Sequence, residues 1–532
     1  MKPRDSDTEA QQLAALKPGG LLHYDYRTAP AKRAKLPEEF RVVQWNIERG
    51  VQFDRIVETL RAVRADILLL QEVDINCRRS GYRNVARDLA EALQMQLYFV
   101  CEFEELDAVD RAPEHAVSSL SPPAVNTAET HPSFSALSSP PALQQQCHFH
   151  GNAILSARAT LSDPFVFPHS AGIDWEKEGW KLHEPRHGFR SVLRCRIAPD
   201  QRTSTLLPDV FLYCCHFEVF CGALSRVRQL LDVFRDASRL LQPEERQKLR
   251  DPHHHHHQQQ QQQKQKQQQQ RNQPAFIIGG DLNTMADGVV RLSRRFGGDR
   301  LRILGVGEKE ACWLQRKVLS RRMDHVTRGC CPFSYRYPLY AAGILHDRLW
   351  NSDCALRLVY GFSREEVAAL DNRRLCFYDP GDKALSTTLD HPDYHGFVRG
   401  KLDWLLLSNL RVAPPDLAEE ALAALLAGGS IAAETASCVR QLQQPQQQQN
   451  HGQRRALPRD GYVLFNEKFD ASDHRGLLLH VRQHVGLPQE VYPEYGATYT
   501  TSWVNIGFFT LTRTLPWAFA AWLLYKRRQR QV

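Results

Sequence analysis

Nine polar residues in this sequence border short apolar runs and could together perform metal and acid–base chemistry. They are Asn46, Glu72, Asn152, His216, Asp281, Asn283, Asp403, Asp473 and His474. Carboxylate and amide oxygens suit a hard cation, Mg²⁺ or Mn²⁺. Histidines beside acids suit proton transfer near neutral pH. A hard cation with general acids and bases is the equipment for hydrolysing a phosphate ester.

The segment 275–284, AFIIGGDLNT, shows the pattern most clearly. Its apolar run predicts a buried strand, and its two glycines predict a sharp exit where the backbone needs freedom. Asp281 and Asn283 are two residues apart, so on an extended segment they project to the same side. Taken alone, the segment is equally typical of a strand that ends in an ordinary turn. Its repetition along the chain favours a site.

The elements that must position these residues are strands alternating with helices. Helical spacing occurs at 53–65, 80–97 and 225–241, and the segment 66–74 is a triple-Leu strand that ends in acids. The predicted strands are 40–48, 66–74, 97–102, 151–156, 186–197, 210–218, 275–284, 401–408 and 477–481.

Four stretches interrupt this pattern and predict loop outgrowths from one domain. Low-complexity sequence, including a His run and a long Gln run, lies directly between a predicted helix and a predicted strand. Such a swelling is tolerated because the entropy cost of closing a loop grows slowly with its length. A polar lead-in is expected to be poorly ordered. The lead-in is 1–38, and the insertions are 104–147, 242–274, 287–400 and 415–457.

The composition limits the class of protein. The chain has 532 residues, a formal charge of +8 and 13 cysteines. This charge suits a phosphate-bearing partner. The cysteines form no C-x-x-C pair, which argues against a zinc ribbon and a secreted disulfide framework. The polar N-terminus has no signal-peptide pattern, so we expect a cytosolic catalytic domain.

The ordered motifs resemble the endonuclease/exonuclease/phosphatase superfamily, which includes DNase I, the inositol polyphosphate 5-phosphatases and the neutral sphingomyelinases. The resemblance implies a four-layer α/β sandwich, in which two mixed β-sheets pack face to face with helices outside. It also implies one catalytic domain over 39–484, with the four stretches above as insertions. The motifs are QWN at 44–46, LQEV at 70–73, GNAILS at 151–156, His216, GDLNT at 280–284, LD at 402–403 and SDH at 472–474.

The resemblance further implies how the metal and the water are held. Glu72 would be the main metal ligand, supported by Asn46 and Asp473. Asp281 would orient or deprotonate the attacking water. Asn283 would hold a phosphate oxygen.

The resemblance assigns the remaining four residues to the phosphate and the substrate. His474 would stabilise or protonate the pentavalent phosphate, and Asp403 would fix its tautomer. His216 matches a second histidine of the nuclease and sphingomyelinase branches. Asn152 would contact the substrate or support the site.

The C-terminal segment 503–532 is apolar and aromatic and ends in a basic cluster. The stretch from Ile506 to Tyr525 has the length of about 20 residues that a spanning helix needs. Arg513 within it would cost about 2.5–3.5 kcal/mol at the bilayer centre. A single-pass helix and an interfacial helix therefore both stay open, and either would associate with a membrane.

These features predict a Mg²⁺-dependent phosphodiesterase held at a cytosolic membrane face, with a phospholipid such as sphingomyelin ahead of nucleic acid as substrate. One alternative is an endonuclease or exonuclease that acts on DNA or RNA. Another is a catalytically silent, membrane-tethered interaction protein. The oligomeric state has no signal in the sequence.

Overall fold

The computed structural model describes residues 6–106, 147–203, 209–242, 273–284, 353–358, 360–380, 398–412 and 463–483, together with shorter pieces at 287–288, 311, 314, 318–319, 388–390, 392, 518–519, 521–523 and 525–526. The predicted insertion 415–457 lies outside the described residues. Most of 104–147, 242–274, 287–400 and 503–532 lies outside them as well.

The first sheet has nine strands, and it joins the two ends of the catalytic region. Its strand order is β1-β4-β5-β3-β2-β16-β14, with β15 paired to β16 and β7 paired to β4. The strands are β1 (Leu21–Asp25), β2 (Glu39–Asn46), β3 (Ile67–Ile75), β4 (Gln96–Glu105), β5 (His148–Ser156), β7 (Arg186–Gly188), β14 (Leu410–Val412), β15 (Val463–Phe465) and β16 (Gly476–Gln483).

The second sheet has five strands in the order β13-β10-β9-β8-β6. It is mixed, because β10 runs parallel to β9 and antiparallel to β13. Its strands are β6 (Leu161–Pro168), β8 (Ser191–Ile197), β9 (Val210–His216), β10 (Ala275–Asp281) and β13 (Asp403–Ser408). A separate pair joins β11 (Asp287–Gly288) to β12 (Val398–Arg399).

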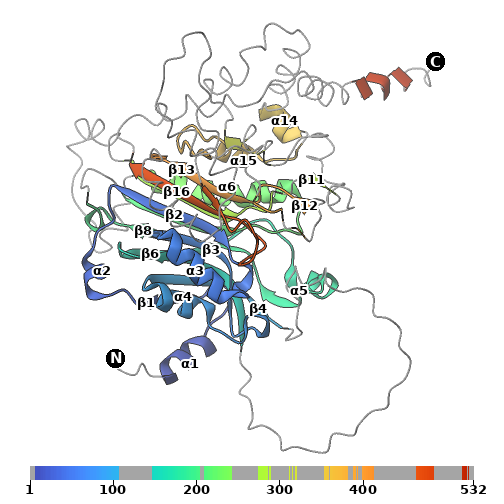
Figure 1. The fold of residues 1–532 in the computed structure, drawn as a ribbon. Coiled ribbons are helices and arrows are strands. Elements are labelled where there is room, and N and C mark those ends of the chain that lie inside the picture. Colours follow the sequence, from blue (N-terminus) through green and yellow to red (C-terminus); the bar gives the residue numbers. More distant parts are fainter. Residues whose placement is uncertain are drawn as a thin grey trace, which may run out of the picture.

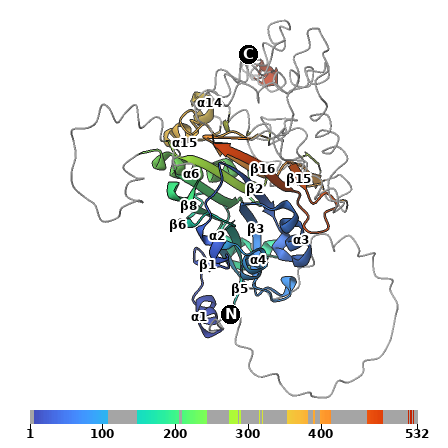
Figure 2. The same cartoon turned by 60° about the vertical axis from the view of Figure 1, so that its left-hand side comes forward.

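Helices cover the outer face of each sheet (Figure 1). Figure 2 shows α3 (Phe53–Val63) and α4 (Val85–Leu93) on one side of the strands, with α6 (Ala223–Leu240) and α15 (Arg364–Ala369) on the other. The other described α-helices are α1 (Ser6–Ala14), α2 (Ala29–Arg33), α5 (Trp175–Glu178) and α14 (Asp353–Leu358). Short 3₁₀ helices occur at Glu48–Gly50, Arg78–Ser80, Trp180–Leu182 and Pro199–Gln201.

Three apolar cores hold these layers together. The strands have continuous apolar runs, so each strand presents apolar side chains on both of its faces, as a strand buried on both sides requires. In β3, Leu68 packs towards α3 and α4, whereas Leu69 packs between the sheets. In β10, Ile277 packs between the sheets and Phe276 packs towards α6. The predicted four-layer sandwich of two mixed sheets is therefore confirmed.

The prediction that 1–38 is a poorly ordered lead-in is wrong for the described part, which begins at residue 6. Strand β1 extends the first sheet by pairing antiparallel with β4, from Leu21 opposite Val100 to Asp25 opposite Gln96. Leu22 and Tyr24 alternate inwards and join the core beside α4. In this edge strand the alternation of buried and exposed residues is short and lies among polar residues, so it was not recognised in the sequence.

The two glycines of segment 275–284 serve a different purpose from the predicted one. Strand β10 runs straight through both of them, and neither has a positive φ. A Cβ at Gly279 would lie 2.4 Å from Leu69 Cδ1 of the first sheet, and one at Gly280 would lie 2.2 Å from the Cys215 carbonyl oxygen of β9. Glycine is needed here for close approach of neighbouring backbone and side chains.

The predicted strand 186–197 is divided in the structure. Its first part, β7, pairs with β4 of the first sheet, and its second part, β8, belongs to the second sheet. The chain changes sheets at Phe189 and Arg190, which brings Arg190 between the two sheets.

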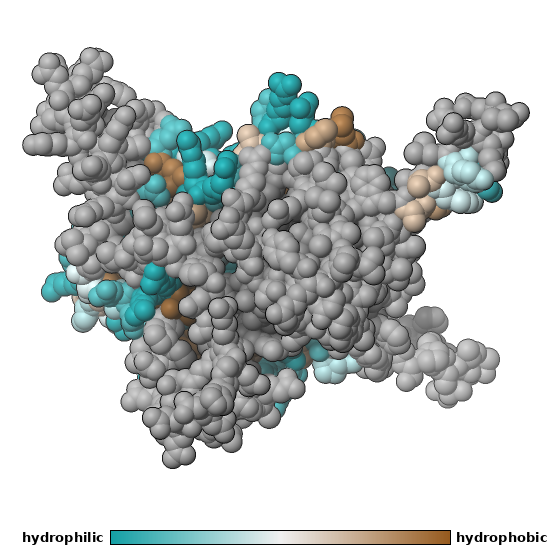
Figure 3. Space-filling view, turned by 90° about the horizontal axis from the view of Figure 1, so that it is seen from above, coloured by the Kyte–Doolittle hydropathy of each residue, from teal (hydrophilic) through white to brown (hydrophobic). Residues whose placement is uncertain are grey.

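Among the described residues, no helix is long and apolar enough to cross a membrane. On the face seen in Figure 3, the described residues in view are mostly hydrophilic, with small hydrophobic groups among them. This is the usual mixture of a protein surface.

Candidate active site

Strand register places three of the predicted residues side by side, at the ends of three neighbouring strands of the second sheet. Asp281 ends β10, where it lies opposite His216 of β9 and opposite Asp403 of β13. All three side chains are buried. The common strand-end position predicted from the sequence is therefore the reason that these residues meet.

Asn46, Glu72 and Asp281 form the oxygen-rich half of the site. The Asn46 side-chain amide donates to Glu72 Oε1 over 3.1 Å and to Asp281 Oδ2 over 3.2 Å. Two carboxylates thus converge on one amide nitrogen. The side-chain oxygen Oδ1 of Asn46 accepts the backbone N–H of Glu48 over 3.0 Å.

Glu72 reaches this position through an irregularity in β3. The pairing of β3 with β5 shifts register between Leu70 and Val73, and Glu72 has a φ of 56°. A non-glycine residue in this conformation is strained, and such strain concentrates at functional sites. The irregular backbone re-aims the carboxylate towards Asn46.

The charges around Glu72 favour its ionised form. Burial alone would raise the pKa of Glu72, but the charge of Arg49 and the hydrogen bond from Asn46 help to hold that pKa well below its ordinary value. Arg49 Nε lies 3.6 Å from Glu72 Oε2. The site therefore presents a permanent carboxylate at neutral pH.

Asp403 and His474 form a hydrogen-bonded pair beside Asp281. Asp403 Oδ2 lies 2.8 Å from His474 Nδ1, and Gln44 Nε2 donates to Asp403 Oδ1 over 2.9 Å. Burial would lower the pKa of His474, but Asp403 and neighbouring carboxylates raise it well above its ordinary value. With Nδ1 engaged, His474 Nε2 points towards Asp281 Oδ2, 3.9 Å away.

Asp281 is placed for proton transfer. Its Oδ1 accepts the backbone N–H of Asn283 over 2.8 Å, while its Oδ2 lies 3.5 Å from His216 Nε2. Burial and the charge of Asp403 raise the pKa of Asp281 to about 6, against the opposing effect of His474. A carboxylate that gains and loses its proton near neutral pH suits a general base.

A buried chain of Glu102, Arg190 and His216 closes the other side of the site. Arg190 Nη1 lies 2.8 Å from Glu102 Oε2 and 2.9 Å from His216 Nδ1. Because a guanidinium only donates, His216 accepts at Nδ1 and carries its proton on Nε2, which faces Asp281. Burial and Arg190 hold the pKa of His216 well below its ordinary value, so the ring is neutral at pH 7.

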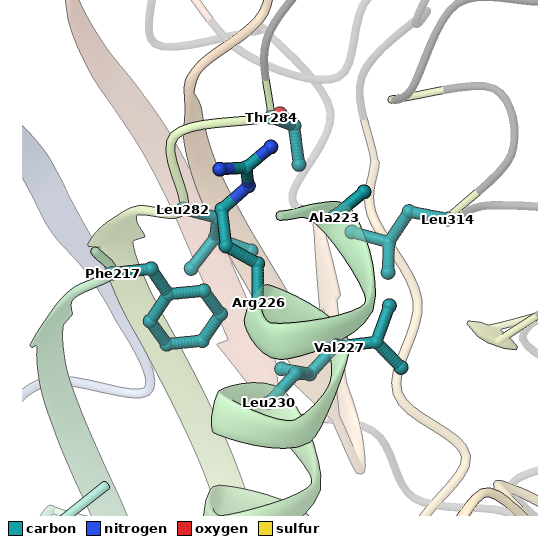
Figure 4. Close-up of a pocket in the computed structure, with 8 residues that line it drawn as sticks. All are labelled: Phe217, Ala223, Arg226, Val227, Leu230, Leu282, Thr284 and Leu314. Carbon is teal, nitrogen blue, oxygen red and sulfur yellow. The ribbon is translucent and has the colours of Figure 1, made fainter. Parts of the chain in front are cut away.

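Asn283 turns back towards the site while its neighbour Leu282 points away. Asn283 has a φ of 47°, and its side-chain amide donates to the Phe217 carbonyl over 2.9 Å. Figure 4 shows Leu282 facing α6 in a small pocket, with the Arg226 guanidinium directed towards Thr284. The buried Leu282 anchors the loop. Strand β10 ends at Asp281, so Asn283 does not lie on the extended segment that the sequence analysis assumed.

Asn152 and Asp473 complete the predicted set. Asn152 is 0% exposed, and neither polar atom of its side chain has a hydrogen-bond partner among the described residues. Leaving such a group unsatisfied costs about 1–3 kcal/mol. Asp473 Oδ1 lies 4.0 Å from His474 Nε2, and the Asp473 N–H donates to Glu48 Oε2 over 3.2 Å.

The structure adds residues that the sequence analysis missed. Glu102 ends a predicted strand and His150 lies two residues before Asn152 on β5, so both carried the strand-end signal. Arg190 carried no such signal, since its role depends on Glu102, 88 residues away. His150 Nδ1 lies 2.8 Å from Asp74 Oδ1, a second histidine–carboxylate pair.

The residues present fit a hard divalent cation near Glu72. Two other buried groups have suitable donor atoms within 4.8 Å of one another: Glu102, His150 and His216, and Asp281, Asp403 and His474. In the first, the Arg190 cation already binds two of the three members. In the second, Asp403 and His474 bind each other. The Glu72 and Asp281 carboxylates, which converge on Asn46, supply the oxygen donors that a hard cation prefers.

A sandwich of two mixed sheets, with carboxylates, amides and a histidine–carboxylate pair at one edge, defines a phosphoric ester hydrolase that works with a divalent metal. The chain belongs to the Endonuclease/Exonuclease/phosphatase family, whose model matches residues 43–474. The resemblance and the enzyme class predicted from the sequence are confirmed. No curated protein matches the sequence significantly.

Several solved structures are similar to this chain at low identity. An endonuclease/exonuclease/phosphatase from Beutenbergia cavernae is 14% identical, with 84% of this chain and 72% of that chain covered and a TM-score of 0.32. The human nocturnin catalytic domain with bound sulfate is 11% identical, with 85% and 97% covered and a TM-score of 0.35. Truncated Caenorhabditis elegans TDP2 is 12% identical, with 84% and 98% covered and a TM-score of 0.33. These similarities are too low to assign a substrate.

Proposed function

We propose that the protein is a Mg²⁺-dependent phosphodiesterase. The observation that carries this proposal is the convergence of Glu72 and Asp281 on the Asn46 amide, beside the Asp403–His474 pair. Mn²⁺ accepts the same oxygen ligands and is the expected substitute.

Glu72 would hold the cation, supported by Asn46 and Asp473. When bound, the cation would neutralise the phosphoryl oxygens and make the phosphorus easier to attack. The strained backbone at Glu72 supports this assignment, because it aims a permanent carboxylate into the site.

Asp281 would take the proton of the attacking water. One of its oxygens is fixed by the Asn283 N–H, which leaves the other facing the centre of the site. His474 Nε2 would donate its proton to a phosphoryl oxygen or to the leaving oxygen, while Asp403 stabilises the charged ring. His216, neutral and protonated on Nε2, would donate a hydrogen bond to the phosphate.

Two amides would position the substrate. A primary amide nitrogen has two N–H groups, and Asn283 gives one of them to Phe217, so the second can reach a phosphoryl oxygen. The buried amide of Asn152 would gain its missing partner from the substrate or from an ordered water.

For the substrate we place a phospholipid such as sphingomyelin ahead of nucleic acid. The supporting observation is the tail 503–532, in which the exposed rings of Phe519 and Trp522 stack 5.7 Å apart and Lys526 lies 4.7 Å from the Trp522 ring. Aromatic and basic side chains settle together at a membrane surface. The tail would hold the catalytic domain at the cytosolic face. Nucleic acid is the second candidate, favoured by the formal charge of +8.

The first experiment measures hydrolysis of bis-(p-nitrophenyl) phosphate by the full chain with and without Mg²⁺. We expect activity that needs the cation and is lost in Asp281→Ala, whereas Asp470→Asn, at an exposed carboxylate, stays active. An inactive wild type would favour the interaction-protein alternative, and a fully active Asp281→Ala variant would show that the hydrolysis does not depend on this site. Sphingomyelin liposomes, plasmid DNA and RNA at matched protein concentration then separate the lipid and nucleic-acid hypotheses.

A further inference from the structure

Thr388, in the segment 287–400 that interrupts the predicted catalytic domain, is fully buried next to the site. Its N–H and that of Leu389 donate to the Gly400 carbonyl over 2.9 and 3.0 Å, and the Gly400 N–H donates back to Leu389 over 2.9 Å. These bonds tie Thr388 to the backbone that leads into β13.

The Thr388 hydroxyl fixes the backbone around Asp403. Its oxygen accepts the N–H of Leu402 over 3.0 Å and the N–H of Asp403 over 3.1 Å. A hydroxyl oxygen has two lone pairs, and both face these N–H groups, while Oγ1 also lies 3.5 Å from the Gly400 carbonyl oxygen. The hydroxyl therefore accepts two backbone hydrogen bonds at the residue that pairs with His474.

The carbonyl of Thr388 fixes the other member of the pair. It accepts the N–H of Arg475, the residue after His474, over 2.8 Å. Thr388 thus binds the backbone N–H of Asp403 and that of Arg475, the residue after His474, although Asp403 and His474 are 71 positions apart in the chain. Gln44 binds the Asp403 side chain, and Trp45 and Asn466 bind the His474 carbonyl, whereas Thr388 has contacts beside both members of the pair.

We propose that Thr388 is a positioning residue for the hydrolysis, and that it sets the separation of Asp403 from His474. This inference rests on the proposed function. In this arrangement Thr388 acts on the substrate indirectly, because its contacts hold the backbone beside the histidine–carboxylate pair.

The test compares Thr388→Val and Thr388→Ala, which remove the hydroxyl, with Thr388→Ser, which keeps it. In full-length protein with Mg²⁺ and bis-(p-nitrophenyl) phosphate, we expect kcat to fall about 10- to 100-fold in Val and Ala with KM within about twofold, and Ser to stay within about threefold of wild type. The matched control is Thr203→Val, whose hydroxyl binds the Leu36 carbonyl over 3.4 Å. Unfolding midpoints identify any variant that fails to fold, and Ala then replaces Val.

A double-mutant cycle separates positioning from general destabilisation. Because Thr388 acts through Asp403, Thr388→Val should reduce kcat by less than about threefold when Asp403→Asn is already present. The inference would be overturned if kcat stayed at the wild-type value in both hydroxyl-deleted variants, or if the Ser variant were as slow as the Val variant. It would also be overturned if the loss in the double variant equalled the product of the two single losses. If wild type itself lacks Mg²⁺-dependent activity, the proposed function fails first.

Discussion

Asp403→Asn is the most informative single change in this site. Asp403 is completely buried and bridges two partners, since its Oδ2 faces His474 Nδ1 at 2.8 Å and its Oδ1 accepts from Gln44 Nε2 at 2.9 Å. Asparagine keeps the shape but has one acceptor in place of two. If its oxygen stays on Gln44, its NH₂ group faces His474, and the ring must move its proton from Nδ1.

The structure bounds the size of the loss. A hydrogen bond to a charged group contributes about 1.5–3 kcal/mol. If this energy is expressed mainly in the transition state, where His474 meets developing charge, kcat falls by about 10- to 150-fold at 1.36 kcal/mol for each tenfold change. KM should change little, because the pair has no role in holding the ground state.

The pH dependence of kcat provides an independent test, through the direction in which its alkaline limb moves. Asp403 is the largest of the charges that raise the pKa of His474. Its removal lowers that pKa, so the alkaline limb, where activity is lost as His474 loses its proton, must move to lower pH. The assay is kcat and KM for bis-(p-nitrophenyl) phosphate across pH, with Asp470→Asn as the control. A kcat within twofold of wild type, or an alkaline limb that does not move, would refute the reasoning.

Three further predictions follow from the same geometry. Without bound metal the pKa of Asp281 is about 6, so kcat/KM should rise with pH through that region and the rise should move to lower pH as Mg²⁺ is increased; a pH-independent rate across about pH 5–7 contradicts this. Glu72→Gln should weaken Mg²⁺ binding at least about tenfold by calorimetry, whereas Glu58→Gln on the exposed side of α3 should not change it. Gly279→Ala should lower the free energy of unfolding by about 1–3 kcal/mol in denaturant titrations, because the new Cβ would lie 2.4 Å from a side chain of the other sheet; Gly172→Ala, with 3.7 Å to its nearest atom, is the control.

Much of the fold could be predicted from local pattern. Apolar runs such as ILLL at 67–70 and FII at 276–278 are buried on both faces, and continuous apolar sequence is the signal of such strands. Edge strand β1 was missed because a strand with one buried face needs only two inward residues, Leu22 and Tyr24, and these give little signal among polar neighbours.

The candidate site was predictable to the extent that its residues end strands. The register that aligns Asp281 with His216 and Asp403 follows directly from that position. Arg190 and Thr388 were not predictable in this way. Each acts by binding groups that are close in space but come from distant or irregular segments, and no local spacing records such a contact.

The position of β2 has a consequence for how the chain folds. This strand lies between β3 and β16, and the Trp45 indole N–H binds the His474 carbonyl across 429 residues. At about 5–20 residues per second, synthesis of β16 follows that of β2 by about 20–90 s. During that time one edge of β2 has no neighbour in the nascent chain and can pair with another strand. Assembly of the catalytic centre is therefore a late event in biosynthesis, and the long segments between its residues increase the time between the synthesis of β2 and that of β16.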